Sequence, residues 1–256
     1  MRTKTLLIAA AALAAATISS QAQVYSQNIV GYINTTVPNG AHQFQFIANQ
    51  LQTVTANGTN KIQDVFGFSA LTSDPNGVTN TVLYYWNGAG YTLYTYYNAA
   101  DSGGSAGFYD GNGKYVTNSL NQGSASFIKN QAGGPITLTY VGTVIQGTNV
   151  YTIKPGFNAF SLYAPISTNI DSVLGGFVGT SDPNGITNDV LYAYNNGWQL
   201  LTYYSAADSG GSAGFYDGNG NYQSKNSAFF PQVGQGFFIK RQATGVEYWT
   251  NSFIAQ

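Results

Sequence analysis

An exact internal repeat is the feature that most constrains how this chain folds. The run AADSGGSAGFYDGNG, residues 99–113, recurs letter for letter at residues 206–220. The match continues outward on both sides, pairing SDPNGVTN with SDPNGITN and GSASFIKNQAGG with GQGFFIKRQATG. The chain is therefore one structural unit written twice, and its fold must accommodate two homologous domains.

The first 22 residues have the organisation of a secretory signal peptide. A basic start at Arg2 and Lys4 precedes an apolar stretch, residues 6–16. Ser20-Gln21-Ala22 then matches the small-x-small pattern of a cleavage site. The apolar stretch is shorter than the roughly 20 residues that a membrane-spanning helix needs. We expect cleavage after this segment, no transmembrane segment, and a protein that is secreted and acts outside the cell or at the cell surface.

The remaining chain divides into a first copy at residues 23–139 and a second copy at residues 140–256. The copies align Phe44 with Phe160 at an offset of 116 but align later positions at an offset of 108. This predicts eight extra residues in the first copy, which we place in the polar stretch Thr53 to Asn60. No Pro-rich or Ser-rich linker separates the copies. They are therefore either packed side by side or joined by a short connector.

Short runs of β-branched and aromatic residues, separated by Gly, Asn and Asp turns, indicate strands in both copies. The clearest are two hairpins, at residues 82–97 and 190–204, each with an Asn-Gly turn signal in its middle. Helical pattern is confined to single turns near residues 62–66 and 170–174. We predict an all-β fold with two homologous tandem β-sandwich or barrel-like domains, of about six to eight strands each, after a cleaved signal peptide.

Charged residues make up only 7% of the chain, which limits the partners that it attracts. Without Arg2 and Lys4, seven basic residues face ten acidic ones, a net charge of −3, and the basic residues form no cluster. Nucleic-acid binding is therefore not expected. The chain contains no cysteine, so each domain must hold together without disulfides despite the predicted export.

The sequence offers no catalytic constellation, and we expect the protein not to be an enzyme. Its single histidine, His42, aligns with Asn158, and no cysteine is present to act as a nucleophile. The only glutamate, Glu247, aligns with Ile136 and has no acidic counterpart in the first copy. The repeated aspartates lie in turn-like segments, which do not raise a carboxyl pKa to the value that a general acid needs.

The repeated aspartates do suggest one metal hypothesis. Asp-Gly-Asn-Gly loops alternate oxygen ligands with glycine, as calcium loops do, although the closing glutamate of an EF-hand is missing. The candidate calcium ligands are Asp101, Asp110 and Asn112 in the first copy and Asp208, Asp217 and Asn219 in the second. We favour the alternative that these loops close on themselves through Asx turns and bind nothing. Calcium is thus the one candidate cofactor.

Aromatic side chains are the densest chemical feature of the chain, and they concentrate in the two hairpins. The candidate residues are Tyr84, Trp86 and Tyr91 in the first copy and Tyr192, Tyr194 and Trp198 in the second. Three roles are open to them. The first is as part of the hydrophobic core, and the second is as an exposed platform for sugar rings. The third is as an exposed stripe that joins subunits by strand addition or by packing of sheet faces.

Four short motifs add a family resemblance. They are Val30-Gly31-Tyr32, F-x-x-I-A-N at residues 44–49, V-L-Y-x-W-N-G-x-G-Y at residues 82–91 and G-x-x-x-F-I-K at residues 123–129. Together they resemble secreted, tandemly duplicated β-rich proteins of verrucomicrobial bacteria, which are functionally uncharacterised. The resemblance covers most of the mature chain except the Gly-Ser loop at residues 101–107. It implies an extracellular location and brings no catalytic residues.

These observations lead to one predicted function and one alternative. We predict a secreted, non-catalytic structural protein of the cell surface or extracellular matrix, which self-associates through its aromatic strands. The alternative is a carbohydrate-binding protein that uses exposed Tyr and Trp platforms. The expected partner is therefore either another copy of the chain or an extracellular glycan.

Overall fold

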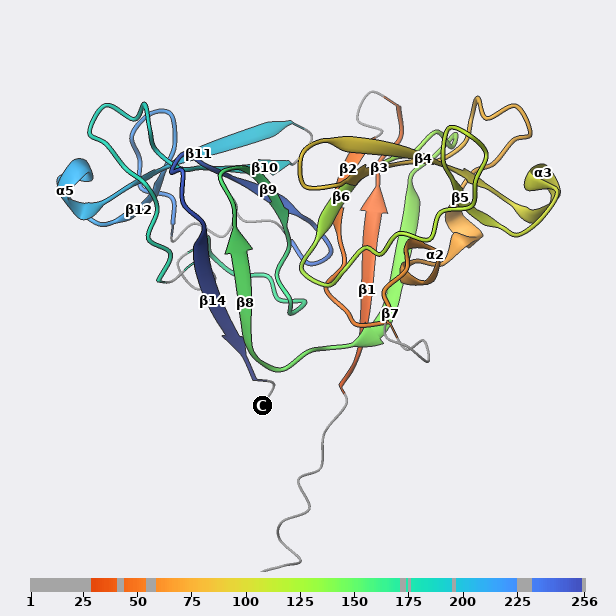
Figure 1. Cartoon of the computed structure of the whole chain (residues 1–256), viewed down its shortest axis with the longest axis horizontal. Helices are drawn as coiled ribbons and strands as arrows, with labels where there is room; N and C mark the ends of the chain where they lie inside the picture. Colours follow the sequence, from red (N-terminus) through yellow and green to blue (C-terminus); the bar gives the residue numbers. More distant parts are fainter. Residues whose placement is uncertain are drawn as a thin grey trace, which may run out of the picture.

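The computed structural model describes residues 29–40, 44–53, 59–170, 174, 176–194, 197–224 and 232–254. The predicted signal peptide, residues 1–22, and His42 lie outside these described residues. Within them the protein is all-β, and each copy supplies seven strands, which agrees with the expected six to eight. The two copies form the two halves of the molecule in Figure 1, the first copy on the right and the second on the left.

The first copy contains a five-stranded antiparallel sheet in the order β2-β6-β3-β4-β5 and a separate antiparallel pair, β1 with β7. Its strands are β1 (Val30–Val37), β2 (Phe44–Ala48), β3 (Val82–Trp86), β4 (Tyr91–Tyr97), β5 (Gly107–Tyr109), β6 (Ala125–Lys129) and β7 (Ile136–Thr143). Its helical segments are single turns: α2 (Ile62–Val65), η2 (Phe68–Ala70) and α3 (Ala99–Ser102).

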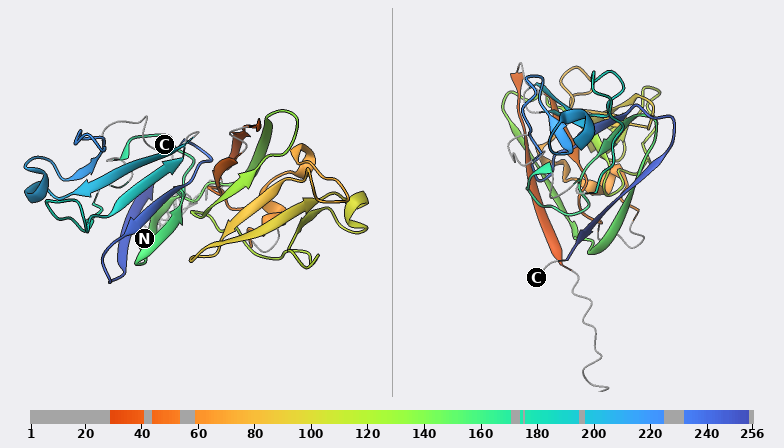
Figure 2. Two further views of the ribbon diagram at one scale, coloured as in Figure 1. Left: turned by 90° about the horizontal axis from the view of Figure 1, so that it is seen from above. Right: turned by 90° about the vertical axis from the view of Figure 1, so that its left-hand side faces the viewer.

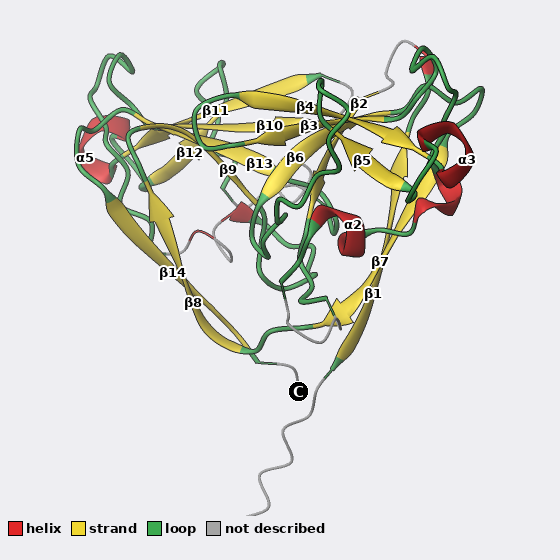
Figure 3. Ribbon diagram, turned by 45° about the vertical axis from the view of Figure 1, so that its right-hand side comes forward, coloured by secondary structure: helices red, strands yellow, loops and turns green. Residues whose placement is uncertain are grey.

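The second copy repeats this plan, with a sheet in the order β12-β11-β10-β13-β9 and a pair, β14 with β8. Its elements are β8 (Gly147–Ile153), β9 (Gly156–Phe160), β10 (Val190–Tyr194), β11 (Trp198–Tyr204), α5 (Ala206–Ser209), β12 (Gly214–Tyr216), β13 (Phe237–Arg241) and β14 (Glu247–Phe253). Figure 3 shows the two sheets along one side of the molecule, with the two strand pairs running away from them on the other.

The predicted hairpins are confirmed as β3–β4 and β10–β11. In the first hairpin Leu83 pairs with Tyr94, and both side chains are buried. Asn87 closes the turn, because its Oδ1 accepts hydrogen bonds from the backbone N–H groups of Ala89 and Gly90, both at 3.0 Å. The local sequence therefore sets both the strand alternation and the turn.

Each copy is a small sandwich whose core lies between the sheet and the strand pair. In the first copy Ile33 and Leu138 of the pair pack with Leu83 of the sheet, and all three are at most 1% exposed. In the second copy Tyr151 and Trp249 occupy the pair, with their rings stacked 4.0 Å apart. Burial of these apolar side chains is the main source of stability for each domain.

The structure corrects the expectation of a plain loop at the start of the repeated run, because α3 and α5 form there. Asn98 caps α3, since its side chain accepts a hydrogen bond from the backbone N–H of Asp101 at 2.8 Å. Ser205 caps α5 in the same way through Asp208. Gly103 then ends α3 with φ +65°, a left-handed conformation that favours glycine.

The boundary between the copies lies further along the chain than residues 139 and 140. β7 extends to Thr143, and all of its residues pair with β1. A boundary after residue 139 would divide this strand, so the hydrogen-bonded unit of the first copy continues through Thr143.

The extra residues of the first copy are divided between two loops rather than placed in one. The amine of Lys129 lies 5.9 Å from the centroid of the Phe44 ring, and the amine of Lys240 lies 5.6 Å from that of Phe157. Phe44 therefore corresponds to Phe157, at an offset of 113, and not to Phe160. Three of the eight extra residues precede β2 and the other five follow it.

The two copies meet around an approximate twofold axis, visible from above in Figure 2. The backbone N–H of Ala48 donates to the carbonyl of Gly234 at 2.9 Å. At the equivalent positions, the backbone N–H of Ser161 donates to the carbonyl of Gly123 at 2.8 Å. Each copy thus pairs the end of its outermost sheet strand, β2 or β9, with the segment that precedes β13 or β6 of the other copy.

Candidate functional site

A hydrophobic cluster fills the junction between the copies, on the sheet face turned away from the strand pairs. Phe46 lies in this cluster, fully buried, and stacks on Phe127 and on Phe238 with ring centroids 4.4 and 4.8 Å apart. The register of β2 and β9 makes Ala159 the equivalent of Phe46. One large ring therefore fills space near the axis that two such rings could not share.

The two hairpins reach across this junction in opposite directions. Trp86 of the first copy packs edge-on against Phe238 of the second, with ring centroids 5.2 Å apart. Tyr194, the equivalent of Trp86, packs edge-on against Phe127 of the first copy at 5.1 Å. Each hairpin therefore contributes aromatic side chains to a surface that belongs to both copies.

Two grooves open beside this cluster, and the approximate twofold axis relates them. The larger groove, of about 410 Å³, is lined by Trp86, Tyr91, Phe157, Tyr192, Trp198, Leu200 and Phe238. The smaller, of about 250 Å³, is lined by Phe44, Tyr84, Tyr91, Phe127, Tyr194 and Trp198. Replacing each residue of the smaller groove by its equivalent in the other copy reproduces the larger groove, apart from Leu200. Tyr91 and Trp198 are equivalent to each other and line both grooves.

The structure brings together all six aromatic residues that the sequence analysis selected, as walls of these two grooves: Tyr84, Trp86, Tyr91, Tyr192, Tyr194 and Trp198. Tyr91 and Trp198 are 40% and 46% exposed, and the other four are partly buried. They are thus neither plain core residues nor a flat platform. They form concave sites that exist only where the two copies meet.

The walls of both grooves are almost entirely apolar, and tyrosine hydroxyls are the main polar groups of the side chains that line them. Within the described part of the chain, the hydroxyls of Tyr84, Tyr91, Tyr192 and Tyr194 form no hydrogen bond. Burial raises the pKa of Tyr91 to about 12 and also raises the pKa of Tyr192. Both hydroxyls therefore stay protonated at neutral pH, where each can donate and accept a hydrogen bond.

The Asp-Gly-Asn-Gly loops, in contrast, close on themselves. Asp110 Oδ1 accepts hydrogen bonds from the backbone N–H groups of Asn112 and Lys114, both at 2.9 Å. Asp217 repeats both bonds at the same distance, with Asn219 as one donor. These are Asx turns, in which the carboxylate serves its own loop.

The two other candidate calcium ligands lie in helices rather than in these loops. Asp101 in α3 accepts a hydrogen bond from the Ser73 hydroxyl at 2.5 Å, and Asp208 in α5 accepts one from the Ser181 hydroxyl. Among the described residues, no three His, Asp or Glu side chains gather in a way that could hold a metal ion. Calcium takes about six to eight oxygen ligands, and the candidate residues do not assemble such a set.

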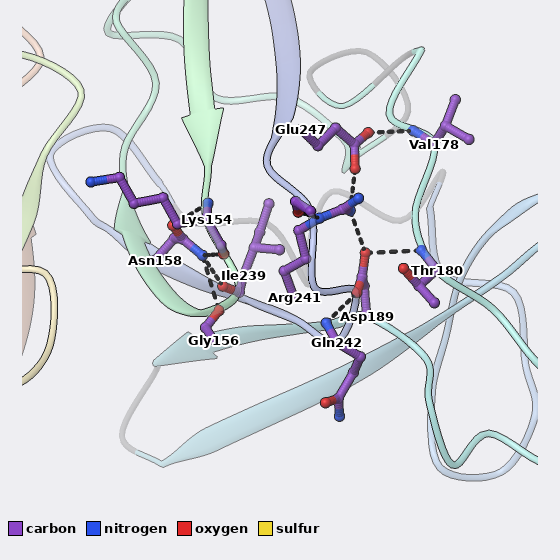
Figure 4. A network of polar contacts seen from close by, with 11 residues as sticks. Lys154, Gly156, Asn158, Val178, Thr180, Asp189, Ile239, Arg241, Gln242 and Glu247 are labelled. Atoms are coloured by element: carbon purple, nitrogen blue, oxygen red, sulfur yellow. Dashed lines mark hydrogen bonds and ion pairs between the residues drawn. The ribbon is translucent and has the colours of Figure 1, made fainter.

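A buried ionic network in the second copy was not expected from the repeat pattern. Arg241 contacts Asp189 at 3.2 Å and also contacts Glu247, and the Asp189 side chain is fully buried (Figure 4). Asp189 further accepts hydrogen bonds from the backbone N–H groups of Thr180 and Gln242, at 2.9 and 2.7 Å. Burial raises the pKa of Glu247, and the charge of Arg241 opposes that shift.

The first copy replaces this network with uncharged residues. Thr81, Asn130 and Ile136 stand at the positions of Asp189, Arg241 and Glu247. The signal that could have revealed the network is this joint change of three aligned positions. None of the three charged residues lines either groove.

Comparisons of the chain with protein-family models, with curated proteins and with solved structures find no match. The resemblance to secreted tandem β-proteins of verrucomicrobial bacteria thus stays a prediction. The helices of the described residues lack the length and the hydrophobicity to cross a bilayer.

Proposed function

We propose that this protein is a secreted, non-catalytic carbohydrate-binding protein whose ligand lies in the two aromatic grooves between the copies. The observation that carries the proposal is the repetition of one groove by the other, with Tyr91 and Trp198 as shared walls. Two equivalent grooves side by side suit a ligand that is itself built of repeated units. A polysaccharide is such a ligand.

The groove walls offer mainly the apolar contact that a sugar ring needs, with few polar groups among them. The apolar C–H faces of a sugar pack against the faces of Tyr and Trp rings. Its hydroxyls need hydrogen-bond partners, and the hydroxyls of Tyr84, Tyr91, Tyr192 and Tyr194, which have none among the described residues, are the groups to supply them. The larger groove, at about 410 Å³, falls within the roughly 300–1,000 Å³ of typical ligand pockets.

The same geometry favours carbohydrate binding over self-association through the aromatic strands. Phe46, Trp86 and Tyr194 already pack across the junction between the copies. The aromatic contact that we expected between separate chains is therefore made within one chain. What faces solvent is a pair of concave grooves rather than a flat stripe.

Self-association at the cell surface or in a matrix is the second candidate, and a different surface supports it. The outward faces of the two strand pairs carry Thr, Ser, Asn, Val and Tyr without a charged residue. Tyr32 on β1 is 71% exposed and Tyr248 on β14 is 69% exposed. Within the described residues each pair forms a sheet of two strands; Gln52 bridges the outer edge of β7 at Thr143, so strand addition would use the edges of β1, β8 or β14.

Two double variants separate these candidates. Tyr91→Ala/Trp198→Ala removes the walls shared by both grooves, and Tyr32→Ala/Tyr248→Ala is the matched control on the strand pairs. Binding is measured as retardation in native gels that contain soluble β-glucan, xylan, galactomannan or glycol chitin. We expect at least one polysaccharide to retard the wild type and the strand-pair variant but not the groove variant.

Light scattering against protein concentration completes the comparison. A wild type that no polysaccharide retards, and whose mass grows with concentration unless Tyr32 and Tyr248 are replaced, would overturn carbohydrate binding and establish self-association.

A further inference from the structure

The second copy carries another kind of pocket at its far end, where α5 lies in Figure 1. A cavity of about 420 Å³ opens between the repeated run, residues 206–220, and strand β11. Its wall includes Thr202, Tyr204, Asp208, Tyr216, Asp217 and Gly218. This wall therefore combines aromatic rings, carboxylates and bare backbone, far from the central grooves.

Every residue that lines this cavity is identical to its equivalent in the first copy. The central grooves come from the same duplication but differ between the copies. Trp86 aligns with Tyr194, and Tyr91 aligns with Trp198. The wall therefore presents the same chemical groups in both copies, whereas the central grooves differ between them. The fold alone does not account for glycine at every position of this wall.

Gly218 shows this most directly. Its φ lies outside the left-handed region, and a Cβ added there would meet nothing within 4 Å. The same is true of its equivalent, Gly111. Neither backbone conformation nor packing therefore requires glycine at this point of the wall. A bare backbone does permit close approach of a ligand.

Asp208 supplies a fixed hydrogen-bond acceptor in the same wall. Its Oδ2 accepts hydrogen bonds from the hydroxyls of Ser181 and Ser205, the latter at 2.8 Å. Its Oδ1 accepts none within the described part of the chain. In the first copy Asp101 is held in the same way by Ser73. In Asp208, therefore, Oδ2 is held by serine hydroxyls, and Oδ1 is available to a ligand.

Two tyrosine rings stand beside this acceptor in a fixed arrangement. Tyr204 and Tyr216 pack edge to face with ring centroids 5.6 Å apart, and Tyr97 and Tyr109 repeat this at 5.8 Å. The Tyr216 hydroxyl donates to the carbonyl of Ser212 at 2.6 Å, which fixes the ring. Rings held this way present an apolar surface to a ligand rather than rearranging around it.

We propose that the end pocket of the second copy binds a single sugar residue, with the free carboxylate oxygen of Asp208 accepting from the sugar hydroxyls, and that the identical residues of the first copy, with Asp101, bind a second one. The tyrosine pair packs against the apolar face of the sugar, and Gly218 or Gly111 lets it approach the backbone. The ligand class rests on the proposed carbohydrate-binding function, but the site is separate from the central grooves. The chain would then hold a glycan at its two ends as well as at its centre.

Isothermal titration of the full chain with the methyl glycosides of glucose, galactose, mannose, xylose and N-acetylglucosamine tests this. Asp101→Asn/Asp208→Asn keeps an acceptor for the serine hydroxyls but replaces the free oxygen with a donor. We expect one of these glycosides to bind with two sites per chain. We expect the variant to lower its affinity at least tenfold, the effect of losing a hydrogen bond to a charged group. Asp64→Asn, on α2, is the matched control and should leave the affinity unchanged.

A second variant and the groove variant make the result decisive. Gly111→Val/Gly218→Val fills the wall without touching the carboxylates and should also abolish binding. Affinity that survives both end-pocket variants, or a wild type that binds none of the five glycosides, overturns the proposal. Loss only in Tyr91→Ala/Trp198→Ala would place all sugar binding in the central grooves, which refutes the end pockets and leaves the proposed function standing.

Discussion

Phe46 of the first copy stacks on Phe238 of the second, with ring centroids 4.8 Å apart. The two residues are not equivalent, because Phe238 corresponds to Phe127 and Phe46 corresponds to Ala159. The junction between the copies therefore repeats one backbone hydrogen bond on both sides, from Ala48 and from Ser161, but is asymmetric in its packing. A large residue on one side is matched by a small one on the other.

Removing the Phe46 ring should destabilise the whole molecule. Phe46→Ala leaves a cavity against Phe127 and Phe238 in a fully buried site, and such substitutions cost about 3–5 kcal/mol. The free energy of unfolding in urea measures the effect. Phe157→Ala is the control, since Phe157 is 42% exposed and its loss should cost clearly less. A cost below about 1 kcal/mol for Phe46→Ala would show that the junction is not packed as described.

Gly236 should not tolerate a side chain, because a Cβ there would lie 2.3 Å from the Cβ of Ala125. Gly236→Ala is expected to cost about 1–3 kcal/mol in unfolding free energy, as overpacking does. Its equivalent position in the first copy is Ala125 itself. Adding Ala125→Gly should therefore restore most of the loss. A double variant no more stable than Gly236→Ala alone would contradict this account.

Breaking the ionic network of the second copy should be costly, whereas replacing it entirely should not be. Arg241→Met leaves the fully buried charge of Asp189 and the partly buried charge of Glu247 without their partner, which costs about 3–5 kcal/mol. The triple variant Asp189→Thr/Arg241→Asn/Glu247→Ile installs the residues of the first copy.

We expect the triple variant to lie within about 1 kcal/mol of the wild type, because a matched uncharged set leaves no buried charge. Chemical denaturation of both variants at pH 7 makes the comparison. If both variants lost the same unfolding free energy, the network would stabilise the domain by more than the neutralisation of its own charges.

The acid stability of the protein should depend on Asp182. Backbone and hydroxyl hydrogen bonds from Thr187 lower its pKa from 3.8 to about 2, and the pKa of Asp74 is lowered in the same direction by Thr79. A lowered carboxyl pKa contributes stability that is present above pH 3.8 and lost as the pH falls through about 2.

Urea titrations between pH 2 and pH 5 test this contribution. Asp74→Asn/Asp182→Asn should flatten the dependence of unfolding free energy on pH in this window, while Asp64→Asn should not. An unchanged slope in the double variant would mean that other carboxylates govern acid unfolding.

The strands and hairpins could be predicted because their signals are local. Alternation puts Leu83, which is buried, on the opposite face of its strand from Tyr84 and Trp86, and the Asn-Gly turn at Asn87 closes the first hairpin through its own side chain. The α3 helix has a local signal too, an Asn98 cap followed by Gly103, but the Gly-Ser composition around it suggested a loop. The repeat boundary was misplaced because β7 is defined by pairing with β1, a contact distant in sequence.

The structure brings the six aromatic residues together as groove walls, an arrangement that the sequence could not predict. Alternation shows that Tyr84 and Trp86 share a face of β3, and it does not show what covers that face. The cover comes from the other copy: Phe238 lies against Trp86, and Phe127 lies against Tyr194. Only a structure of both copies reveals that the grooves lie between them.

The junction also changes how the grooves respond to protein concentration. The copies are linked through residues 144–146, between β7 and β8, so they associate within a single chain. Two separate chains with the same contacts would dissociate on dilution, whereas a short covalent connection sets a local concentration on the order of millimolar. The central grooves, which exist only where the copies meet, are therefore intact in every folded molecule, however few molecules there are.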